Sequence, residues 1–490
     1  MAAPAAKPHL VFFPFPAQGH VTPAFQLARL LHRCHGFDVT FIHTEHNRRR
    51  LLRARGPGAL AGAPGFRFAA VPDGLPPSDE DAAQDMAALL LSFPAMLHHF
   101  KELVASDELP LPSRCCLVSD VYQVLRAAQE IGLPCVTFWI TSASSFMAFQ
   151  QLQHLIDKGL VPLKDAEQLR NGYLDSTAVD WVPGLPKSMR LRDFPSFIRT
   201  TDPDDAVLAL TLRSMECHRT VPAAVIFHTF DELETPAISA MSDILPPIYA
   251  VGPLPLLLKQ AAAAAGAGVD DPAGGDTSSA SCSLSKEDRA CLDWLDGKRP
   301  NSVVFASFGS IVKRTGEQLV ELAWGLANSG YEFLWVIRGD DQAAALPPEF
   351  LPETEGRGLV TSWCPQEAVI RHAAVGAFLT HCGWNSMMEA VCAGVPMLCW
   401  PFAADQQTNS RAACAEWRVG VEVGEGPGRR EVEAAIREAM GGGERGEEVR
   451  RSAAEWKEKA ALAARPGGSS WVNLERVVNE VFMPLMTNKH

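Results

Sequence analysis

The sequence lacks an excess of basic residues: its 490 residues carry a net charge of −13 at neutral pH, and no block of Lys and Arg stands out. Nucleic acids and anionic membranes attract basic surfaces, so this balance argues against both as partners. No apolar run is long enough to cross a bilayer. An anionic small molecule stays open as a ligand, because backbone N–H groups can hold one without net positive charge.

The sequence also lacks the cysteine spacings of disulfide frameworks and zinc sites. Its twelve cysteines include no C-x-x-C pair, which favours free thiols in a reducing compartment. Cys364, His372, His381 and Cys382 lie within one segment, but their spacing does not match that of zinc ligands. We therefore predict a soluble cytoplasmic protein with no metal site.

Apolar runs alternate with segments of helical spacing along the chain. Residues 9–16 and 37–44 are predicted strands, and the apolar residues between them recur as on one face of a helix. Further predicted strands span 114–120, 134–140 and 223–230. This alternation predicts an α/β fold with a mostly parallel sheet covered on both faces.

The alternation stops after residue 252 and restarts near 292, and the length of the chain suggests two domains. The intervening stretch is rich in Gly, Ala and Ser, as is typical of linkers. We expect two Rossmann-like domains at 1–252 and 291–468, a flexible linker at 253–290, and a C-terminal helix at 469–490 packing back toward the first domain. Such halves bind ligands at the carboxyl ends of their strands.

The densest group of polar residues follows the predicted strand 376–382. Gly383 would make a tight turn, and a helix would start at Asn385 or Ser386. Free N–H groups at a helix N-terminus form a ready diphosphate site, and Ser310 follows another strand in the same way. Each residue alone has a structural alternative: Ser386 and Glu389, for example, have capping-box spacing. Their joint spacing favours a ligand site.

The segment from Trp363 to Gln406 resembles the nucleotide-sugar signature of plant UDP-dependent glycosyltransferases of small molecules, which are family 1 enzymes with the GT-B fold. It matches W-x-P-Q, H-C-G-W-N-S, the following E, G-V-P and the closing D-Q. The resemblance extends over nearly the whole chain. It implies two Rossmann-like domains facing each other across a cleft.

The resemblance also implies a role for each donor residue. By analogy, Trp363 stacks on uracil, Gln366 lies beside uracil and ribose, and Glu389 accepts hydrogen bonds from the ribose. His381, Asn385 and Ser386 would hold the diphosphate. In this family a final glutamine goes with glucose, so Gln406 implies UDP-glucose as the donor substrate, with no cofactor. The full set of implied donor residues is Ser310, Trp363, Cys364, Gln366, His381, Trp384, Asn385, Ser386, Glu389, Asp405 and Gln406.

The resemblance assigns His20 as the general base for the acceptor hydroxyl and Asp120 as the carboxylate that orients it. The sequence agrees, because both residues end neighbouring predicted strands on one side of the sheet. The helix dipole disfavours a charged histidine by at most ~2 kcal/mol, which a carboxylate at hydrogen-bond distance should outweigh. We expect a metal-independent inverting transfer that gives a β-glucoside.

Other interpretations explain less of the sequence. A NAD-dependent oxidoreductase would show G-x-G-x-x-G after the first strand, where residues 17–20 read A-Q-G-H. The D-x-D strings of a metal-dependent transferase occur only in charged loops, at 79–81 and 202–204. A nucleotide-sugar sensor without turnover would not need His20 and Asp120. Another donor, UDP-galactose or UDP-xylose, stays open, since Ile140 stands where relatives carry a sugar-contacting threonine.

The acceptor is the least defined part of the prediction. The chain resembles the branch that includes cyanohydrin, terpenoid and cytokinin glucosyltransferases, whose acceptors differ widely. Phe93, Phe146 and Phe197 are candidates for an apolar acceptor cleft, although core packing is at least as good an explanation for each. We expect the partners of a monomeric enzyme to be a UDP-sugar and a small hydrophobic acceptor.

Overall fold

The computed structural model describes residues 7–76, 84, 86–106, 114–264, 283–310, 314–424 and 426–487. They group into two compact units. Unit 1 comprises the described residues of Met1–Ile140, Ala209–Lys286 and Ala463–His490. Unit 2 comprises those of Thr141–Leu208 and Glu287–Leu462. None of the helices in the described ranges is both long and apolar enough to span a membrane.

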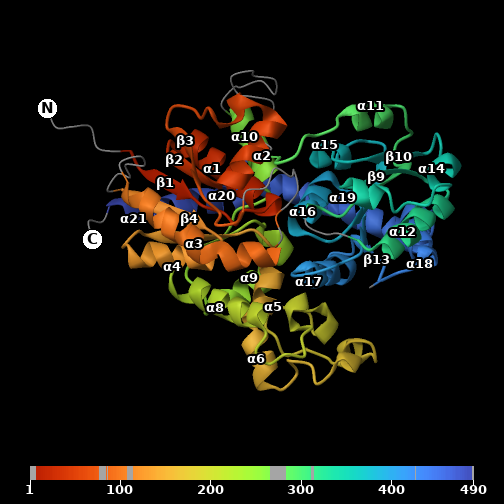
Figure 1. Ribbon diagram of the computed structural model, residues 1–490, viewed down its shortest axis with the longest axis horizontal. Coiled ribbons are helices and arrows are strands. Elements are labelled where there is room, and N and C mark those ends of the chain that lie inside the picture. The colour runs from red at the N-terminus through yellow and green to blue at the C-terminus, as the bar shows by residue number, and fades with distance from the viewer. Residues whose placement is uncertain are drawn as a thin grey trace. The chain divides into compact units, whose positions relative to one another are not determined.

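Unit 1 is built on a seven-stranded parallel sheet with strand order β3-β2-β1-β4-β5-β6-β7 (Figure 1). Leu10 and Phe12 on β1 pack into one hydrophobic cluster, and Val11 and Phe13 pack into another. Both faces of the sheet are therefore buried, which is why its strands read as continuous apolar runs. The strands are β1 (His9–Phe12), β2 (Asp38–Thr44), β3 (Phe66–Val71), β4 (Cys115–Ser119), β5 (Cys135–Trp139), β6 (Val225–Phe227) and β7 (Ile248–Ala250).

Helices cover this sheet. Helix α1 follows β1 and buries Val21, Leu27 and Leu31 in the cluster that contains Leu10. The helices of unit 1 are α1 (Gln18–His35), α2 (Glu45–Arg55), η1 (Pro57–Leu60), α3 (Met86–Ala105), α4 (Tyr122–Glu130), α9 (Asp231–Met241), α10 (Leu254–Ala264), α20 (Ser469–Val477), η7 (Val478–Phe482) and α21 (Met483–Thr487), with α8 (Ala206–Thr220) shared at its start with unit 2.

Unit 2 contains a six-stranded parallel sheet with strand order β10-β9-β8-β11-β12-β13. Its strands are β8 (Val303–Ser307), β9 (Glu332–Val336), β10 (Gly358–Thr361), β11 (Val375–Thr380), β12 (Met397–Cys399) and β13 (Gly420–Glu422). Two parallel sheets with helices confirm the predicted α/β class.

The helices of unit 2 include a pair whose termini are well defined. Helix α12 begins with a capping box between Thr315 and Gln318. It packs beside α18, where Glu321 and Arg429 form an ion pair. The helices are α11 (Ala290–Asp296), α12 (Gly316–Ser329), α13 (Asp340–Ala343), α14 (Phe350–Glu353), α15 (Gln366–Ile370), α16 (Trp384–Ala393), α17 (Gln406–Arg411), η6 (Ala412–Glu416), α18 (Arg429–Met440) and α19 (Glu444–Ala464).

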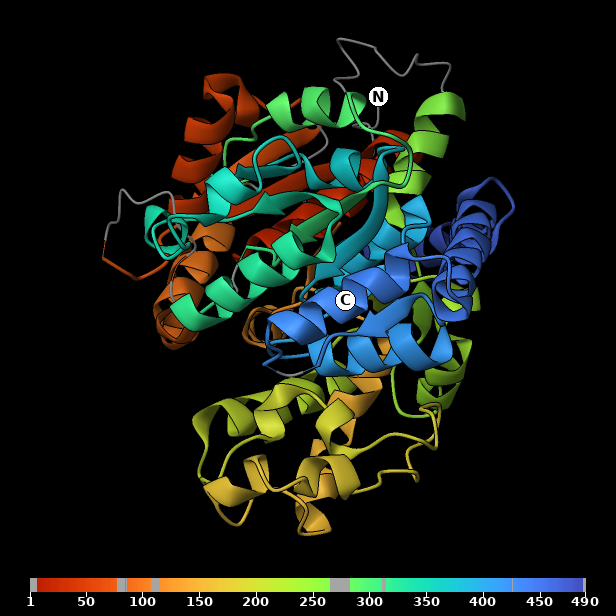
Figure 2. The same ribbon diagram turned by 90° about the vertical axis from the view of Figure 1, so that its right-hand side faces the viewer.

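The segment 141–208 groups with unit 2, which differs from the expected first domain at 1–252. Figure 2 shows it as a group of short helices and loops coloured orange to yellow. The reason is a set of long-range hydrogen bonds: Ser142 donates to Asn409 (2.7 Å), and Thr408 donates to the carbonyl of Asp193 (2.8 Å). Its helices are α5 (Ala143–Gln150), α6 (Leu152–Asp157), η2 (Ala166–Leu169), α7 (Tyr173–Ser176), η3 (Leu191–Asp193) and η4 (Ser196–Ile198).

The start of the expected linker at 253–290 is helical instead. Helix α10 buries Leu254, Leu257 and Leu258 in the core of unit 1, because leucines at positions i, i+3 and i+4 share one helix face. Residues 265–282 of the expected linker lie outside the described residues. The C-terminal helices also belong to unit 1: Tyr249 on β7 donates a hydrogen bond to Glu480 (2.9 Å).

Candidate active site

The ends of two adjacent strands bring His20 and Asp120 together in unit 1. Strands β1 and β4 pair in parallel, with Phe12 opposite Val118, so both chains leave the sheet at the same edge. His20 lies in the first turn of α1 and hydrogen-bonds through Nδ1 to Oδ2 of Asp120. The N–H of Phe15 donates to the other carboxylate oxygen (2.8 Å). Both oxygens of Asp120 are therefore engaged.

This geometry makes His20 suited to act as a base. The side chain of Asp120 is 5% exposed, whereas that of His20 is 29% exposed, so a substrate can reach the imidazole but not the carboxylate. With the Nδ1 proton donated to Asp120, the Nε2 lone pair of neutral His20 is the basic one. The carboxylate would stabilise the imidazolium formed when Nε2 takes a proton.

The candidate acceptor residues are apolar and mostly buried. Phe93 belongs to a core cluster of unit 1, and its ring lies 5.7 Å from that of Phe15, which in turn lies 4.9 Å from the His20 ring. Phe146 is fully buried on α5, and Phe197 lies 5.9 Å from Phe149. Phe15 is not among the residues predicted from the sequence, although it lies only five positions before His20.

In unit 2, His381 follows β11 and is held between two glycines. A Cβ added to Gly383 would lie 2.3 Å from the His381 Nε2, and one added to Gly309 would lie 2.7 Å from it. Gly309 also has φ +71°, a conformation that side chains disfavour. Burial and the charges of Arg314 and Arg338 lower the pKa of His381 to about 3. The imidazole is therefore neutral at physiological pH.

Helix α16 begins at Trp384, one residue before the expected start, with Gly383 as its N-cap. No side chain caps this end, so the capping-box alternative for Ser386 and Glu389 is wrong. Both side chains bind Gln366 instead: its Nε2 donates to Ser386 (2.8 Å) and to Glu389 (2.8 Å). Ser307 donates to the other end of this amide (2.9 Å). First-turn N–H groups without a side-chain cap suit an anion.

Glu389 is a carboxyl group whose burial raises its pKa to about 8, although the hydrogen bond from Gln366 acts in the opposite direction. An unfolded chain has an ordinary glutamate pKa of about 4.3. Between these values the folded protein binds one more proton, so the free energy of unfolding should fall as pH rises, by up to about 1.4 kcal/mol per pH unit.

Glu389→Gln should remove this dependence, because glutamine does not titrate. The measurement is urea unfolding of both proteins at about pH 5 and about pH 8, and the two should diverge in this window. Glu353→Gln, at an exposed position on α14 of unit 2, is the control. Parallel pH profiles of wild type and Glu389→Gln would contradict the prediction.

The remaining donor residues lie on neighbouring segments of unit 2. Gln406 begins α17, and its Oε1 accepts hydrogen bonds from the N–H groups of Phe402 (2.8 Å) and Ala403 (2.9 Å), which fixes its amide. Asp405 accepts from Asn409 (2.7 Å). Trp384 is buried with its ring 5.9 Å from that of Trp417.

Three further expected residues flank this group. Trp363 has the guanidinium of Arg338 5.7 Å from its ring centroid. Cys364 is buried beside Cys291, and this contact together with burial raises the pKa of the Cys364 thiol. Ser310 directly follows Gly309 after β8. Unit 2 thus contains every expected donor residue, at or near the carboxyl ends of its strands.

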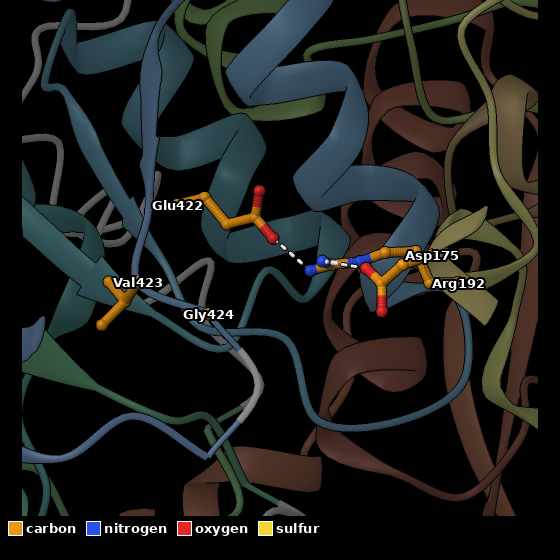
Figure 3. Close-up of a pocket in the computed structure, with 5 residues that line it drawn as sticks. All are labelled: Asp175, Arg192, Glu422, Val423 and Gly424. Atoms are coloured by element: carbon orange, nitrogen blue, oxygen red, sulfur yellow. Dashed lines mark hydrogen bonds and ion pairs between the residues drawn. The ribbon is translucent and has the colours of Figure 1, made fainter. Parts of the chain in front are cut away.

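A cavity of about 520 Å³ in unit 2 contains none of these residues. Figure 3 shows Arg192 reaching both Asp175 and Glu422 there. Since two carboxylates offset one guanidinium, the cavity offers no unpaired cation to a phosphate. The described residues contain no cluster of three or more side chains suited to a metal ion. Asp202 and Asp204 are exposed, and residues 79–81 lie outside the described residues.

Known proteins are similar to this chain in sequence and in fold. The family described as "UDP-glucoronosyl and UDP-glucosyl transferase" matches residues 283–449. A 7-deoxyloganetin glucosyltransferase of Gardenia jasminoides is 50% identical, with 96% of this chain and 97% of that protein covered. The chain belongs to the UDP-glycosyltransferase family.

Other members of the UDP-glycosyltransferase family agree with this assignment. An (R)-mandelonitrile beta-glucosyltransferase of Prunus dulcis is 46% identical, with 97% of this chain and 98% of that protein covered. Among solved structures, Os79 from O. sativa in complex with UDP matches with a TM-score of 0.77 at 29% identity, covering 96% of this chain and 99% of that one. Medicago truncatula UGT71G1 complexed with UDP-glucose matches with a TM-score of 0.78 at 26% identity, covering 97% of this chain and 98% of that one. The expected GT-B fold is confirmed.

Proposed function

We propose that this UDP-glycosyltransferase transfers glucose from UDP-glucose to a hydroxyl group of a small hydrophobic plant metabolite, with inversion at the anomeric carbon. The observation that carries this proposal is the hydrogen-bonded pair of His20 and Asp120. A binding protein without turnover has no use for a base held by a buried carboxylate. Two relatives, the 7-deoxyloganetin glucosyltransferase and the (R)-mandelonitrile beta-glucosyltransferase, support glucose as the sugar and a small plant molecule as the acceptor.

In the proposed reaction, Nε2 of His20 takes the hydroxyl proton as the acceptor oxygen bonds to the anomeric carbon. The bond from that carbon to the donor phosphate breaks, and its electron pair leaves with UDP. An α-linked donor then gives a β-glucoside. The N-terminal turn of α16 and its neighbours would stabilise the charge that grows on the diphosphate, which is usually the largest catalytic contribution.

Within the donor site, we propose that Trp363 stacks on uracil and that Glu389 and Gln366 bind the ribose. His381, Ser310, Asn385 and Ser386 would contact the diphosphate. Trp384, Asp405 and Gln406 would face the sugar. The reaction needs no metal in this scheme. The monomeric state and the cytoplasmic location expected from the sequence remain predictions.

The direct test is turnover with UDP-glucose against a panel of hydroxylated aglycones that includes cyanohydrins and terpenoid alcohols, each with and without EDTA. We expect one β-glucoside product, identified by NMR, at a rate that EDTA does not change. Dependence on a divalent cation, an α-linked product, or binding without turnover on every acceptor would contradict the proposal.

Gln406 should determine which sugar is preferred. Its Oε1 is held by two backbone N–H groups, which leaves its Nε2 to donate to a sugar hydroxyl. Gln406→His should lower kcat/KM for UDP-glucose about tenfold and raise the relative rate with UDP-galactose, because one well-placed hydrogen bond contributes about 1–2 kcal/mol. Gln406→Asn, which is too short to reach, should lower the first rate without raising the second. An unchanged ratio in Gln406→His would contradict this role.

A further inference from the structure

A buried cation lies next to the proposed diphosphate site, and the described residues form no ion pair with it. Arg314 directly precedes Thr315, the N-cap of α12, and is 6% exposed. Its guanidinium carbon lies 4.4 Å from the ring centroid of Phe308 and 4.1 Å from that of Trp400. Nη2 donates to the carbonyl of Trp400 (3.2 Å). The guanidinium is thus held in one place by two aromatic faces and one carbonyl.

The charge of Arg314 is not compensated. No carboxylate among the described residues forms an ion pair with it, and its buried Nε has no hydrogen-bond partner within the same ranges. Burial lowers the pKa of Arg314 to about 10, so it stays charged at neutral pH. Aromatic faces stabilise a cation by far less than the desolvation of an ion usually costs. A buried guanidinium in this state suits an oxyanion.

The strand order shows which part of unit 2 lies closest to the guanidinium of Arg314. Phe308 follows β8, Trp400 follows β12, and β11 lies between these two strands. A guanidinium in contact with both therefore lies over the carboxyl end of β11, where His381 follows. The effect of Arg314 on His381 agrees with this position. The N-terminus of α16 and Ser310 belong to the same edge of the sheet.

We propose that Arg314 binds the diphosphate of the UDP-sugar donor, an inference that rests on the proposed function. Its two Nη groups can contact phosphate oxygens in the paired manner that guanidinium favours. The nucleotide would supply the negative charge that the described protein residues do not. Arg314 is therefore a donor-binding residue outside the segment from Trp363 to Gln406 that carries the nucleotide-sugar signature.

The test measures binding of UDP and of uridine by calorimetry, without an acceptor. Arg314→Met keeps the length of the side chain and its packing on the two rings but removes the charge. It should weaken UDP about tenfold or more, since a hydrogen bond to a charged group contributes about 1.5–3 kcal/mol. Uridine, which has no phosphate, should bind within about twofold of wild type. Arg314→Lys should fall between the two proteins for UDP.

Lys298→Met is the matched control, because Lys298 also lies over an aromatic ring in unit 2, 4.3 Å from the centroid of Trp294, but is paired with Glu332. It should leave UDP affinity unchanged. Thermal unfolding without ligand shows whether each variant is folded. If Arg314→Met is unfolded, the comparison of UDP with uridine is made with Arg314→Lys instead.

Three results would overturn the inference. Unchanged UDP affinity in Arg314→Met and Arg314→Lys would show that the guanidinium does not touch the diphosphate. Equal weakening of UDP and uridine would indicate a purely structural role. Unchanged UDP affinity in Arg314→Met together with weaker binding of UDP-glucuronate, titrated in the same way, would place the cation against a sugar carboxylate. Failure of wild type to turn over UDP-glucose would contradict the proposed function alone, since UDP binding is measured separately.

Discussion

His20→Ala should lower kcat by about 10²–10⁴-fold, the usual contribution of a positioned general base. The acceptor hydroxyl would then lose its proton only to water while it attacks the sugar. His20 is not among the residues proposed to bind the donor, so the KM for UDP-glucose should stay within about threefold. Initial rates with the best acceptor, measured at saturating donor, provide the comparison.

Two further variants show whether the loss of kcat comes from the pair of His20 and Asp120. Asp120→Asn keeps the shape of the side chain but removes the carboxylate that accepts from His20 and from Phe15, so it should also reduce kcat strongly. His32→Ala is the control: this histidine lies on the same helix α1, hydrogen-bonds to the carbonyl of Phe37 (2.7 Å), and has its ring centroid 5.5 Å from that of Phe66. A His20→Ala enzyme as fast as wild type would remove His20 from the mechanism.

Gly383→Ala should weaken UDP binding roughly 100-fold, because the new Cβ would lie 2.3 Å from the His381 Nε2. The backbone at Gly309 also lies close to the imidazole, because a Cβ added there would lie 2.7 Å from the same Nε2, so the ring has little space in which to move. The backbone that begins α16 must therefore shift, and with it the N–H groups proposed to meet the diphosphate. Calorimetric titration with UDP measures the effect.

Gly442→Ala is the control for Gly383→Ala. An added Cβ at Gly442 would meet nothing within 4 Å, and its φ is not positive, so UDP affinity should not change. A folded Gly383→Ala protein that binds UDP as tightly as wild type would show that His381 and the start of α16 do not form the diphosphate site.

The sequence was sufficient to predict the elements whose pattern is local and regular. Buried parallel strands such as β1 and β11 are continuous apolar runs, and α12 carries its capping box in the sequence. The meeting of His20 and Asp120 was also predictable. Parallel neighbours end at one edge of a sheet, so Asp120, directly after β4, lies close to the first turn of the helix that follows β1, where His20 stands.

Other features depend on contacts that no local pattern encodes. The helices of segment 141–208 are too short to show a helical repeat of apolar residues in the sequence. Their grouping with unit 2 depends on single hydrogen bonds such as that from Ser142 to Asn409. The leucines of α10 stand directly before an alanine-rich stretch with the composition of a linker. For this reason the sequence did not predict the helix. The position of Arg314 depends on two rings from different strands, Phe308 and Trp400, so no spacing along the chain reveals it.

The grouping of segment 141–208 with unit 2 limits how the protein can be divided. The chain passes from one unit to the other four times, near residues 140, 208, 286 and 462. No single cut therefore releases either unit whole. A fragment that ends at Gly252 would carry α5 without Asn409 and β7 without Glu480. Isolated halves should be poorly folded, and protease nicking should leave two pieces that stay associated until denatured.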